Sequence, residues 1–354
     1  MKKGSLKLKV AHIVGSLNVG GAERFVIDLC SIQKKLNMKP AIISLGSPDD
    51  ALVGECRVNN IPVANYGGGS LIKIIRVFFV LLKFDIIHIH SPHALKFLSV
   101  ALPFFNKKII YTRHGAAPLT APHWNRLHLK IEKHINAITF VSKEGFDNFQ
   151  QQHNWQNTPC LVIDNGVLID PVNKNESTLF RIGSVGRMIP LKHQISLLKA
   201  VSLLKEEVQN SIELNFFGDG ACIAQLKSYQ SENLTNVAIN FHGMINNREL
   251  IYSNIDVLVV TSETEGLSMV IIEAMANRIP VIATNVGGNP KLVLNDKTGW
   301  LFDYGDEQSL MNHLQVLIDN RKLVDTLGDN AFTYIRDHFS IKNSAQKYEK
   351  LYLG

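Results

Sequence analysis

The chain alternates short apolar runs with longer segments of helical character. The apolar runs span residues 9–15, 40–46, 85–90, 108–114, 137–142 and 161–164 in the first half, and 180–186, 212–218, 237–243, 257–261 and 281–284 in the second. Most of them end in Gly, Ser or His. Nearly continuous apolar strands of this kind are typical of parallel sheets that helices cover on both faces. The pattern therefore predicts an α/β protein with two doubly wound, Rossmann-like domains.

A polar, aperiodic segment separates the two sets of runs. Residues 166–178 contain Pro171 and show no periodicity, which is typical of a linker. A chain of 354 residues also exceeds the roughly 250–300 residues at which single cores stop growing. We expect domains at 1–165 and 179–335, a linker at 166–178 and a final helix within 336–354. Because open parallel sheets bind ligands beyond the carboxyl ends of their strands, we expect the site in a cleft between two facing domains.

Composition argues against several classes of protein. The chain is 45% hydrophobic and 19% charged, as an ordinary globular protein is, and its apolar runs fall short of the roughly 18 residues of a membrane span. We therefore expect a cytoplasmic location. The four cysteines are widely spaced, which indicates neither a disulfide framework nor a zinc site.

Positive charge is concentrated in the first half of the chain. Residues 1–165 hold 20 Lys and Arg against 10 Asp and Glu, a net charge of +10, whereas residues 166–354 hold 17 against 21, a net charge of −4. A basic half suits nucleic acid, an anionic membrane surface or an anionic substrate. We expect no nucleic-acid partner, because the sequence has no recognised nucleic-acid module and no interleaved basic-aromatic strand pattern.

A glycine-containing loop follows the first predicted strand. In residues 15–24 (GSLNVGGAER), Ala22 and Glu23 stand where a P-loop requires Lys and Ser or Thr, and no GxGxxG dinucleotide fingerprint occurs in the chain. Gly20 and Gly21 still allow a ligand to approach the backbone closely, beside the free N–H groups of the following helix. A plain strand-to-helix turn remains an alternative.

The corresponding loop of the second domain carries two cations. In residues 183–193 (GSVGRMIPLKH), Arg187 stands just past a strand and Lys192 near the start of the next helix. Two cations in these places can converge on a diphosphate. Taken alone, a surface Arg and a surface Lys near a turn would explain the same pattern.

A third stretch, SETEGLSMVIIEA at residues 262–274, sets carboxylates around an apolar run. The pattern predicts a loop that contains Glu265, then a helix over 268–277 that contains Glu273. An ionised Glu273 is costly in apolar surroundings unless it has a partner. The first turn of the helix offers free N–H groups at Met269 and Val270 and the positive end of the helix dipole, which suit a phosphate.

Together these motifs resemble the nucleotide-sugar site of retaining glycosyltransferase family 4, whose members have the GT-B fold. The resemblance rests on Glu265 and Glu273, with seven residues between them. Further motifs follow in family order: Gly20-Gly21-Ala22-Glu23, His114-Gly115, Phe140-Val141-Ser142, Asn165-Gly166-Val167, Gly186-Arg187 with Lys192, Gly218-Asp219-Gly220, His242-Gly243, Pro280-Val281-Ile282-Ala283, Gly287-Gly288 and Thr298-Gly299. The sequence departs from the family pattern in two places. Family members often have Gly where this chain has His193, and Phe-Gly where it has Leu267-Ser268.

The resemblance implies a role for each matched residue. Arg187 and Lys192 would hold the donor diphosphate and stabilise charge on the leaving group, helped by backbone N–H groups at Ser268 and the two residues after it. Glu265 would contact hydroxyls of the transferred sugar, and Glu273 the ribose hydroxyls. The other residues implied in donor binding are Gly186, Gly218, Met244 and Ile245.

From the first domain, which supplies the acceptor site in GT-B enzymes, the resemblance implies three further residues. Gly20 and Gly21 would approach the diphosphate and sugar, and His114 would lie near the reacting sugar or the acceptor. His114 could equally be a satisfied histidine at a strand end. The final helix is expected, by resemblance only, to return to this domain.

We expect transfer with retention of configuration and without a metal ion. Two cations and a helix N-terminus can stabilise the negative charge of the leaving group, and no Asp-x-Asp motif occurs in the sequence. Neither a metal nor a cofactor is expected. His88 and His90 share one face of a predicted strand without a carboxylate partner, and His93 follows them.

The function expected is transfer of a sugar, from a UDP-sugar, to a saccharide acceptor in the synthesis of a surface polysaccharide or glycan. The acceptor could be linked to a polyprenyl diphosphate at the inner face of the cell membrane. Cationic, apolar residues 72–84 then fit either a core-packed helix or peripheral contact with an anionic membrane. An enzyme that makes a small soluble glycoside, and a nucleotide-sugar-binding protein without turnover, remain alternatives.

Overall fold

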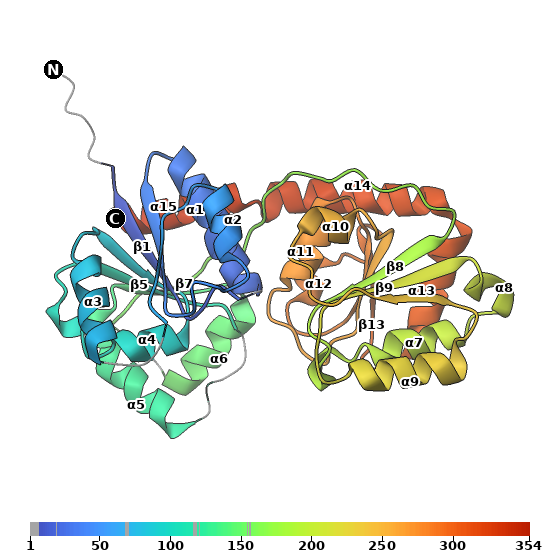
Figure 1. Cartoon of the computed structure of the whole chain (residues 1–354), viewed down its shortest axis with the longest axis horizontal. Coiled ribbons are helices and arrows are strands. Elements are labelled where there is room, and N and C mark those ends of the chain that lie inside the picture. Colours follow the sequence, from blue (N-terminus) through green and yellow to red (C-terminus); the bar gives the residue numbers. More distant parts are fainter. Residues whose placement is uncertain are drawn as a thin grey trace, which may run out of the picture. The chain divides into compact units, whose positions relative to one another are not determined.

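The computed structural model describes residues 7–18, 20–67, 71–115, 119, 121–153, 155 and 157–354. The chain divides into two compact units, Met1–Gly166 with Ile341–Gly354, and Val167–Ser340. Each unit is a parallel sheet with helices packed on both faces (Figure 1). Within the described ranges, none of the helices combines the length and the apolarity that crossing a bilayer requires.

The first unit contains a seven-stranded sheet in the order β3-β2-β1-β4-β5-β6-β7. Its strands, all parallel to their neighbours, are β1 (Lys9–Val14), β2 (Lys39–Ser44), β3 (Val63–Asn65), β4 (Ile86–Ile89), β5 (Lys108–Arg113), β6 (Ala137–Phe140) and β7 (Cys160–Val162). The helices are α1 (Gly21–Lys35), α2 (Val53–Val58), α3 (Leu71–Leu81), α4 (Pro92–Leu98), η1 (Leu102–Phe104), α5 (Pro122–Ile131), η2 (Glu132–His134), α6 (Lys143–His153) and α15 (Ile341–Leu353). The winding direction reverses between β1 and β4, so ligands are expected outside the carboxyl ends of these two strands.

The second unit contains a six-stranded parallel sheet in the order β10-β9-β8-β11-β12-β13. The strands are β8 (Phe180–Val185), β9 (Ile212–Phe217), β10 (Ala238–Phe241), β11 (Val257–Val260), β12 (Val281–Thr284) and β13 (Gly299–Phe302). The helices are η3 (Pro190–Lys192), α7 (Ile195–Ser202), α8 (Glu206–Gln209), α9 (Ile223–Asn233), α10 (Arg248–Tyr252), α11 (Met269–Ala276), α12 (Asn289–Leu292), α13 (Glu307–Asp319) and α14 (Arg321–His338). Here the winding direction reverses between β8 and β11.

Burial on both faces explains why the strands are apolar almost throughout. Along β11, Val257 and Val259 pack into one apolar cluster of the second unit, whereas Leu258 and Val260 pack into the cluster on the other face. Successive side chains of a strand point to opposite faces, so a sheet covered on both sides favours apolar residues at nearly every position. The prediction of two doubly wound parallel-sheet domains is therefore confirmed.

Two strands were missed in the sequence. β3 has only three residues, Val-Ala-Asn, all half-buried, and β13 is Gly-Trp-Leu-Phe, which begins with a glycine. Both lie at the edge of a sheet. Edge position alone does not explain the difference, because the edge strands β7 and β10 are no better buried and were predicted.

The boundary between the units lies at Gly166 and Val167. Residues 167–178, most of the segment expected to be a linker, belong to the second unit. There the N–H of Val172 donates to Asn277 Oδ1 at 2.9 Å, and the N–H of Asn175 donates to the carbonyl of Ser253 at 2.9 Å.

Helix α15 belongs to the first unit and packs beside α1 (Figure 1). Residues 336–340 belong to the second unit. Tyr348 and Tyr352 of α15 are buried against the sheet of the first unit.

Candidate active site

The loop after β8 begins with Gly186, whose backbone conformation suits only a residue without a side chain. Gly186 has a φ of +144°, and its N–H donates to the carbonyl of Phe217 at 2.9 Å. Gly218 follows β9 with a φ of +142°, and a Cβ there would overlap the carbonyl oxygen of Gly186. The two glycines thus let the loops after β8 and β9 touch backbone to backbone.

Arg187 follows directly, with an exposed side chain. Its carbonyl accepts a hydrogen bond from Gln194 Nε2 at 3.0 Å, which fixes the backbone of the loop. η3 ends at Lys192, and His193 adopts the left-handed region at φ +48°. That conformation explains why a glycine suits this position, and histidine is among the side chains that tolerate it.

Lys192 and Glu265 form an ion pair at the point where the sheet reverses its winding. Lys192 Nζ lies 2.6 Å from Glu265 Oε1, and Ser262 Oγ donates to the same oxygen at 2.7 Å. The two side chains are 24% and 10% exposed, so solvent screens the pair only partly. The sequence analysis named both charged residues, but not their direct contact or Ser262.

Backbone contacts hold the loop after β8 against the loop after β11. The N–H of Glu263 donates to the carbonyl of Leu191 at 2.9 Å, and Thr261 Oγ1 donates to the carbonyl of Lys192 at 2.8 Å. The side chain of Glu263 is exposed, in contrast to that of Glu265. Because adjacent parallel strands end at the same edge of the sheet, these two loops necessarily meet there.

α11 starts at Met269, four residues after Glu265, with Ser268 as its N-cap. The N–H groups of the first turn have no acceptor within a helix, and the positive end of the helix dipole lies beside them. The buried side chains of Ser268 and Met269 and the half-buried side chain of Val270 keep this turn packed on the unit. A negatively charged group would therefore be stabilised at the start of α11.

Glu273 is buried, with 6% of its surface exposed, and both of its carboxylate oxygens have protein partners. Arg248 Nε donates to Oε1 at 3.1 Å and its Nη2 lies 3.1 Å from the same oxygen, while the Tyr252 hydroxyl donates to Oε2 at 2.7 Å. Both partners stand on α10, four residues apart, on one face of that short helix. The sequence analysis missed them, although the cost of burying a carboxylate required such a partner.

The segment before α10 carries the residues implied in binding the base. The N–H of Gly218 donates to the carbonyl of Gly243 at 2.8 Å, which places residues 243–245 at the carboxyl edge of the sheet. The side chain of Met244 is 64% exposed, whereas Ile245 packs partly against the apolar cluster that includes α11. The structure thus gathers these residues, Gly186, Gly218, Lys192, Glu265 and α11 on one edge of the second unit.

The first-unit candidates form a separate group. Gly20 is the N-cap of α1, with an extended backbone, and its carbonyl accepts from the N–H of Arg24 at 3.1 Å; Val19 before it lies outside the described residues. His114 follows β5 and lies 5.6 Å, between ring centroids, from Phe25 of α1. The helix that starts at Gly21 therefore reaches His114.

His114 is held by a second histidine. Its Nε2 lies 3.0 Å from His90 Nδ1, and burial lowers the pKa of His114 to about 4. The rings of His88 and His90 lie side by side on one face, with centroids 3.9 Å apart and planes tilted by 37°. His93 instead is exposed and lies against Trp124. The sequence analysis did not foresee that His12 of β1 joins His88 and His90.

Comparison with models of known protein families shows which family the chain belongs to. Residues 19–170 match the family model described as Glycosyltransferase Family 4, and residues 168–334 match the model described as glycosyl transferases group 1. The chain is a glycosyltransferase of the GT-B, family 4 type. The predicted family is therefore confirmed, and with it the prediction that the chain is an enzyme.

Individual relatives agree with the family. The chain is 29% identical to an Escherichia coli UDP-Gal:alpha-D-GlcNAc-diphosphoundecaprenol alpha-1,3-galactosyltransferase, covering 100% of this chain and 98% of that one. It is 27% identical to the Staphylococcus aureus capsular polysaccharide biosynthesis glycosyltransferase CapM, over 64% of this chain and 57% of that one. The crystal structure of Anabaena HepE in complex with UDP and glucose has a TM-score of 0.85 at 20% identity, covering 97% of this chain and 99% of that chain. This structural likeness confirms the predicted GT-B fold.

Proposed function

We propose that this glycosyltransferase moves a sugar, with retention of configuration and without a metal ion, from a UDP-sugar to a saccharide carried on a polyprenyl diphosphate. The observation that carries the proposal is the contact of Lys192 with Glu265 beside the first turn of α11. It combines a cation for a phosphate and a carboxylate for sugar hydroxyls in one place. The name of the Escherichia coli relative, which gives UDP-Gal as donor and a diphosphoundecaprenol-linked sugar as acceptor, supports this choice of substrates.

The reaction mainly requires stabilisation of the negative charge that develops on the leaving group. When the bond between the anomeric carbon and the diphosphate breaks, negative charge develops on the phosphate and positive charge on the sugar. Lys192, the exposed Arg187 and the N–H groups at the start of α11 can stabilise the phosphate without a metal. Glu265 then binds hydroxyls of the sugar, and Lys192 holds its carboxylate in place.

The nucleoside occupies the rest of the same edge in this proposal, where Met244 and Ile245 border the base. Glu273 can accept few further hydrogen bonds from the ribose. A carboxylate has about four lone-pair positions; Arg248 occupies two on Oε1 and Tyr252 one on Oε2. One position on Oε2 therefore remains for a ribose hydroxyl. We expect Glu273→Gln to weaken UDP binding by about tenfold, because hydrogen bonds to charged groups contribute about 1.5–3 kcal/mol.

In the first unit, Gly20 and Gly21 approach the diphosphate and sugar, and His114 approaches the reacting sugar or the acceptor. The acceptor hydroxyl attacks on the face that the leaving group vacates, and the donor phosphate takes its proton. This route gives retention without a covalent intermediate.

UDP release is the direct test. The enzyme is incubated with UDP-glucose, UDP-galactose, UDP-N-acetylglucosamine or UDP-N-acetylgalactosamine and a polyprenyl-diphosphate-linked N-acetylglucosamine, with and without EDTA. Turnover with at least one donor is expected, unchanged by EDTA, and the product should keep the anomeric configuration of the donor by NMR. Strong inhibition by EDTA, or an inverted product, would contradict the proposed mechanism.

Matched variants assign the chemistry to the site. Glu265→Gln should lower kcat/KM by about 100-fold, whereas Glu263→Gln, in the same loop but exposed, should leave it unchanged. Lys199→Gln on α7 provides the equivalent control for Lys192. Equal effects of Glu263→Gln and Glu265→Gln would refute the assignment.

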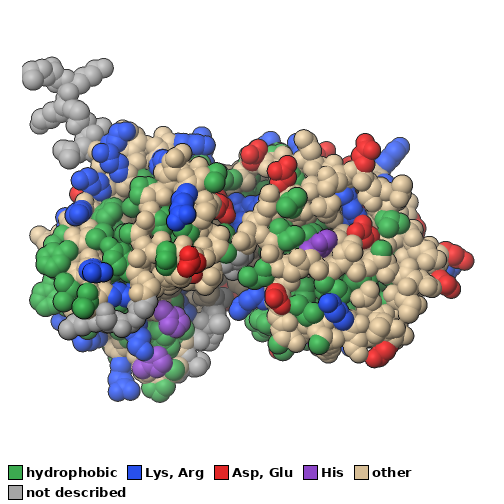
Figure 2. Space-filling model, viewed as in Figure 1, with side chains coloured by type: hydrophobic (Ala, Val, Ile, Leu, Met, Phe, Trp, Pro, Cys, Tyr) green, Lys and Arg blue, Asp and Glu red, His purple; other side chains and the backbone are tan. Residues whose placement is uncertain are grey.

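An apolar face of α3 supports contact with a membrane. Ile72, Ile75 and Phe79, with Leu82 just after the helix, are 62%, 48%, 61% and 41% exposed, and their spacing places them on one helical face. We call these four residues the α3 patch. Arg76 and Lys83 beside it are exposed as well, and Figure 2 shows the hydrophobic side chains gathered over α3 with Lys and Arg around them.

We propose that the α3 patch inserts into the cytoplasmic face of an anionic membrane, where a lipid-linked acceptor resides. Co-sedimentation with vesicles that contain phosphatidylglycerol should succeed at low salt and weaken at high salt. Ile72→Gln with Phe79→Gln should abolish it, whereas Leu203→Gln with Val316→Gln, two exposed apolar residues of the second unit, should not. No binding at either salt concentration would count against membrane contact.

A further inference from the structure

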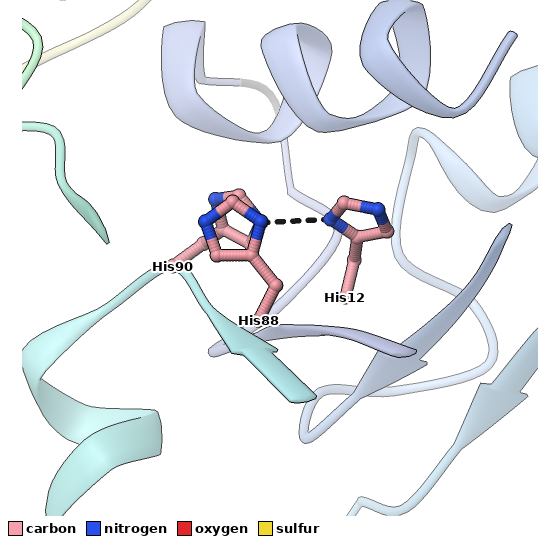
Figure 3. A group of neighbouring side chains, drawn as sticks. All are labelled: His12, His88 and His90. Carbon is pink, nitrogen blue, oxygen red and sulfur yellow. Dashed lines mark hydrogen bonds between the residues drawn. The ribbon is translucent and has the colours of Figure 1, made fainter. Parts of the chain in front are cut away.

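A chain of hydrogen bonds links four residues of the first unit, of which His90 and His114 directly follow the carboxyl ends of β4 and β5. His12 Nδ1 of β1 lies 2.9 Å from His90 Nε2, as Figure 3 shows, and His90 Nδ1 lies 3.0 Å from His114 Nε2. At the other end, His12 Nε2 lies 2.8 Å from Gln33 Oε1 of α1. We call Gln33, His12, His90 and His114 the histidine relay.

His88 stands on a second branch that starts at the same glutamine. Gln33 Nε2 donates to the Tyr352 hydroxyl at 3.4 Å, which lies 2.6 Å from His88 Nδ1, and His88 Nε2 lies 2.6 Å from Thr112 Oγ1. The possible ligand atoms of His12, His88 and His90 lie within 4.8 Å of one another, close enough to suggest a metal site. However, each ring nitrogen of the three is already hydrogen-bonded, so a metal ion would have to displace these bonds. Hydrogen bonding accounts for the cluster on its own.

The relay has a direction. Gln33 turns its NH₂ group to Tyr352 and its oxygen to His12, so His12 carries its proton on Nε2 and accepts at Nδ1. His90 then donates from Nε2 and accepts at Nδ1, which requires the proton of His114 to sit on Nε2. The Nδ1 of His114 is left as a bare lone pair, buried and without a partner among the described residues.

The reverse direction is less favourable. Flipping the Gln33 amide would reverse each bond and place a proton on His114 Nδ1, where it would be a buried N–H donor with no partner in the described part of the chain. Orphaned buried N–H groups are rarer in proteins than under-satisfied acceptors.

Burial also keeps the rings neutral, because it lowers the pKa of His12 and of His114 to about 4 and that of His90 well below its ordinary value. A neutral ring can donate at one nitrogen and accept at the other, as the chain of bonds requires.

We propose that Gln33, acting through His12 and His90, fixes the tautomer of His114 so that Nδ1 accepts a hydrogen bond from a hydroxyl of the substrate. The inference rests on the proposed function, which places His114 at the reacting sugar or the acceptor. Gln33, His12 and His90 are positioning residues in this scheme. A substrate hydroxyl would satisfy the one relay nitrogen that the described protein leaves unpaired.

The tautomer can be measured without any substrate. The full chain, labelled with nitrogen-15 in its histidines, is examined by NMR at pH 7, and the signal of His114 is assigned by its loss in His114→Gln. The nitrogen shifts distinguish protonated from bare nitrogens, and we expect the proton of His114 on Nε2. A proton on Nδ1 would overturn the proposal, whatever the activity of the enzyme.

Variants of Gln33 then connect the tautomer to catalysis. Gln33→Leu removes the acceptor of His12 and should give mixed tautomers of His114 with a loss of about tenfold in kcat/KM, which corresponds to about 1.4 kcal/mol. Gln33→Glu keeps an acceptor oxygen and should retain both the tautomer and most of the activity. Ser31→Ala on the same helix is the control, because Ser31 bonds only to the carbonyl of Ile27 among the contacts found for it.

Unchanged activity in Gln33→Leu despite a changed tautomer would refute the proposed role of the relay. The same is true of an activity loss in Gln33→Leu while the wild-type tautomer persists. If the wild type releases no UDP with any donor, the proposed function fails, but the tautomer measurement still stands by itself. If Gln33→Leu does not fold, the wild-type spectrum decides.

Discussion

Removing the guanidinium of Arg248 should destabilise the second unit by about 3 kcal/mol. Arg248→Met would leave the carboxylate of Glu273, 6% exposed, with the Tyr252 hydroxyl still donating but no cation beside it. Breaking a buried pair by removing one partner costs about 3–5 kcal/mol, because the other charge stays buried. We take the lower end of that range, since the Arg248 side chain is 20% exposed and water can enter the vacated space.

Differential scanning calorimetry measures this loss. In a unit the size of Val167–Ser340, 1 kcal/mol shifts Tm by about 2–4 °C, so Arg248→Met should lower the Tm of that transition by about 6–12 °C. Hydrogen exchange in peptides from α11 would assign the loss to the helix that carries Glu273. Arg336→Met, which removes an exposed ion pair with Asp337 on α14, should lower the Tm much less.

A double variant tests whether the buried charge is the cause. A neutral amide is cheaper to bury than an unpaired carboxylate, so adding Glu273→Gln to Arg248→Met should restore about 1 kcal/mol or more. The reasoning fails if Arg248→Met lowers Tm no further than Arg336→Met does. It also fails if the double variant is less stable than Arg248→Met alone.

Three further predictions concern other parts of the chain. Lys192→Ala should lower kcat by about 100-fold with little change in KM, because the ammonium acts most on charge that develops in the transition state; an effect on KM alone would contradict this. The first unit should lose stability as pH falls below about 6.5, because burial lowers the folded pKa of His12 to about 4 while the unfolded chain takes up that proton near pH 6.5. Urea denaturation should show that His12→Gln reduces the loss between pH 7 and pH 5 by about 2 kcal/mol, and an unchanged pH dependence would refute the assignment. Gly218→Ala should destabilise the second unit by about 1–3 kcal/mol, because its φ of +142° and the carbonyl of Gly186 oppose a side chain, whereas Gly54→Ala, with open space around it in α2, should be neutral or stabilising by thermal unfolding.

The central strands were predictable because burial on both faces leaves a strong mark in sequence. Every residue of β11 is buried and all four are apolar, and in β12, also buried throughout, three of the four are apolar. The edge strands β3 and β13 were not predicted: β3 has only three residues, all half-buried, and β13 begins with a glycine and has two half-buried residues. A polar, aperiodic segment such as 167–178 can be bound along the surface of a unit as easily as it can join two units, and its sequence alone does not distinguish these two cases.

The sequence names candidate site residues but not the contacts between them. Lys192 and Glu265 are 73 positions apart, and they touch because β8 and β11 are neighbours, an order that strand sequences alone do not encode. The need of Glu273 for a partner was evident from its apolar surroundings. That the partners are Arg248 and Tyr252 depends on where α10 packs, which no local pattern reports.

The two units use the same place in the fold for opposite chemistry. In the second unit, the strands at the reversal of winding, β8 and β11, are followed by loops that carry Lys192 and Glu265, charges that suit a diphosphate and a polar sugar. In the first unit, the corresponding strands are β1 and β4, and the side chains there are the neutral rings of His12 and His90. A neutral imidazole can bind a hydroxyl but does not attract a phosphate as a cation does. Part of the positive charge of the first unit is instead carried by the exposed Arg76 and Lys83 beside the α3 patch, where the proposed membrane contact would use it.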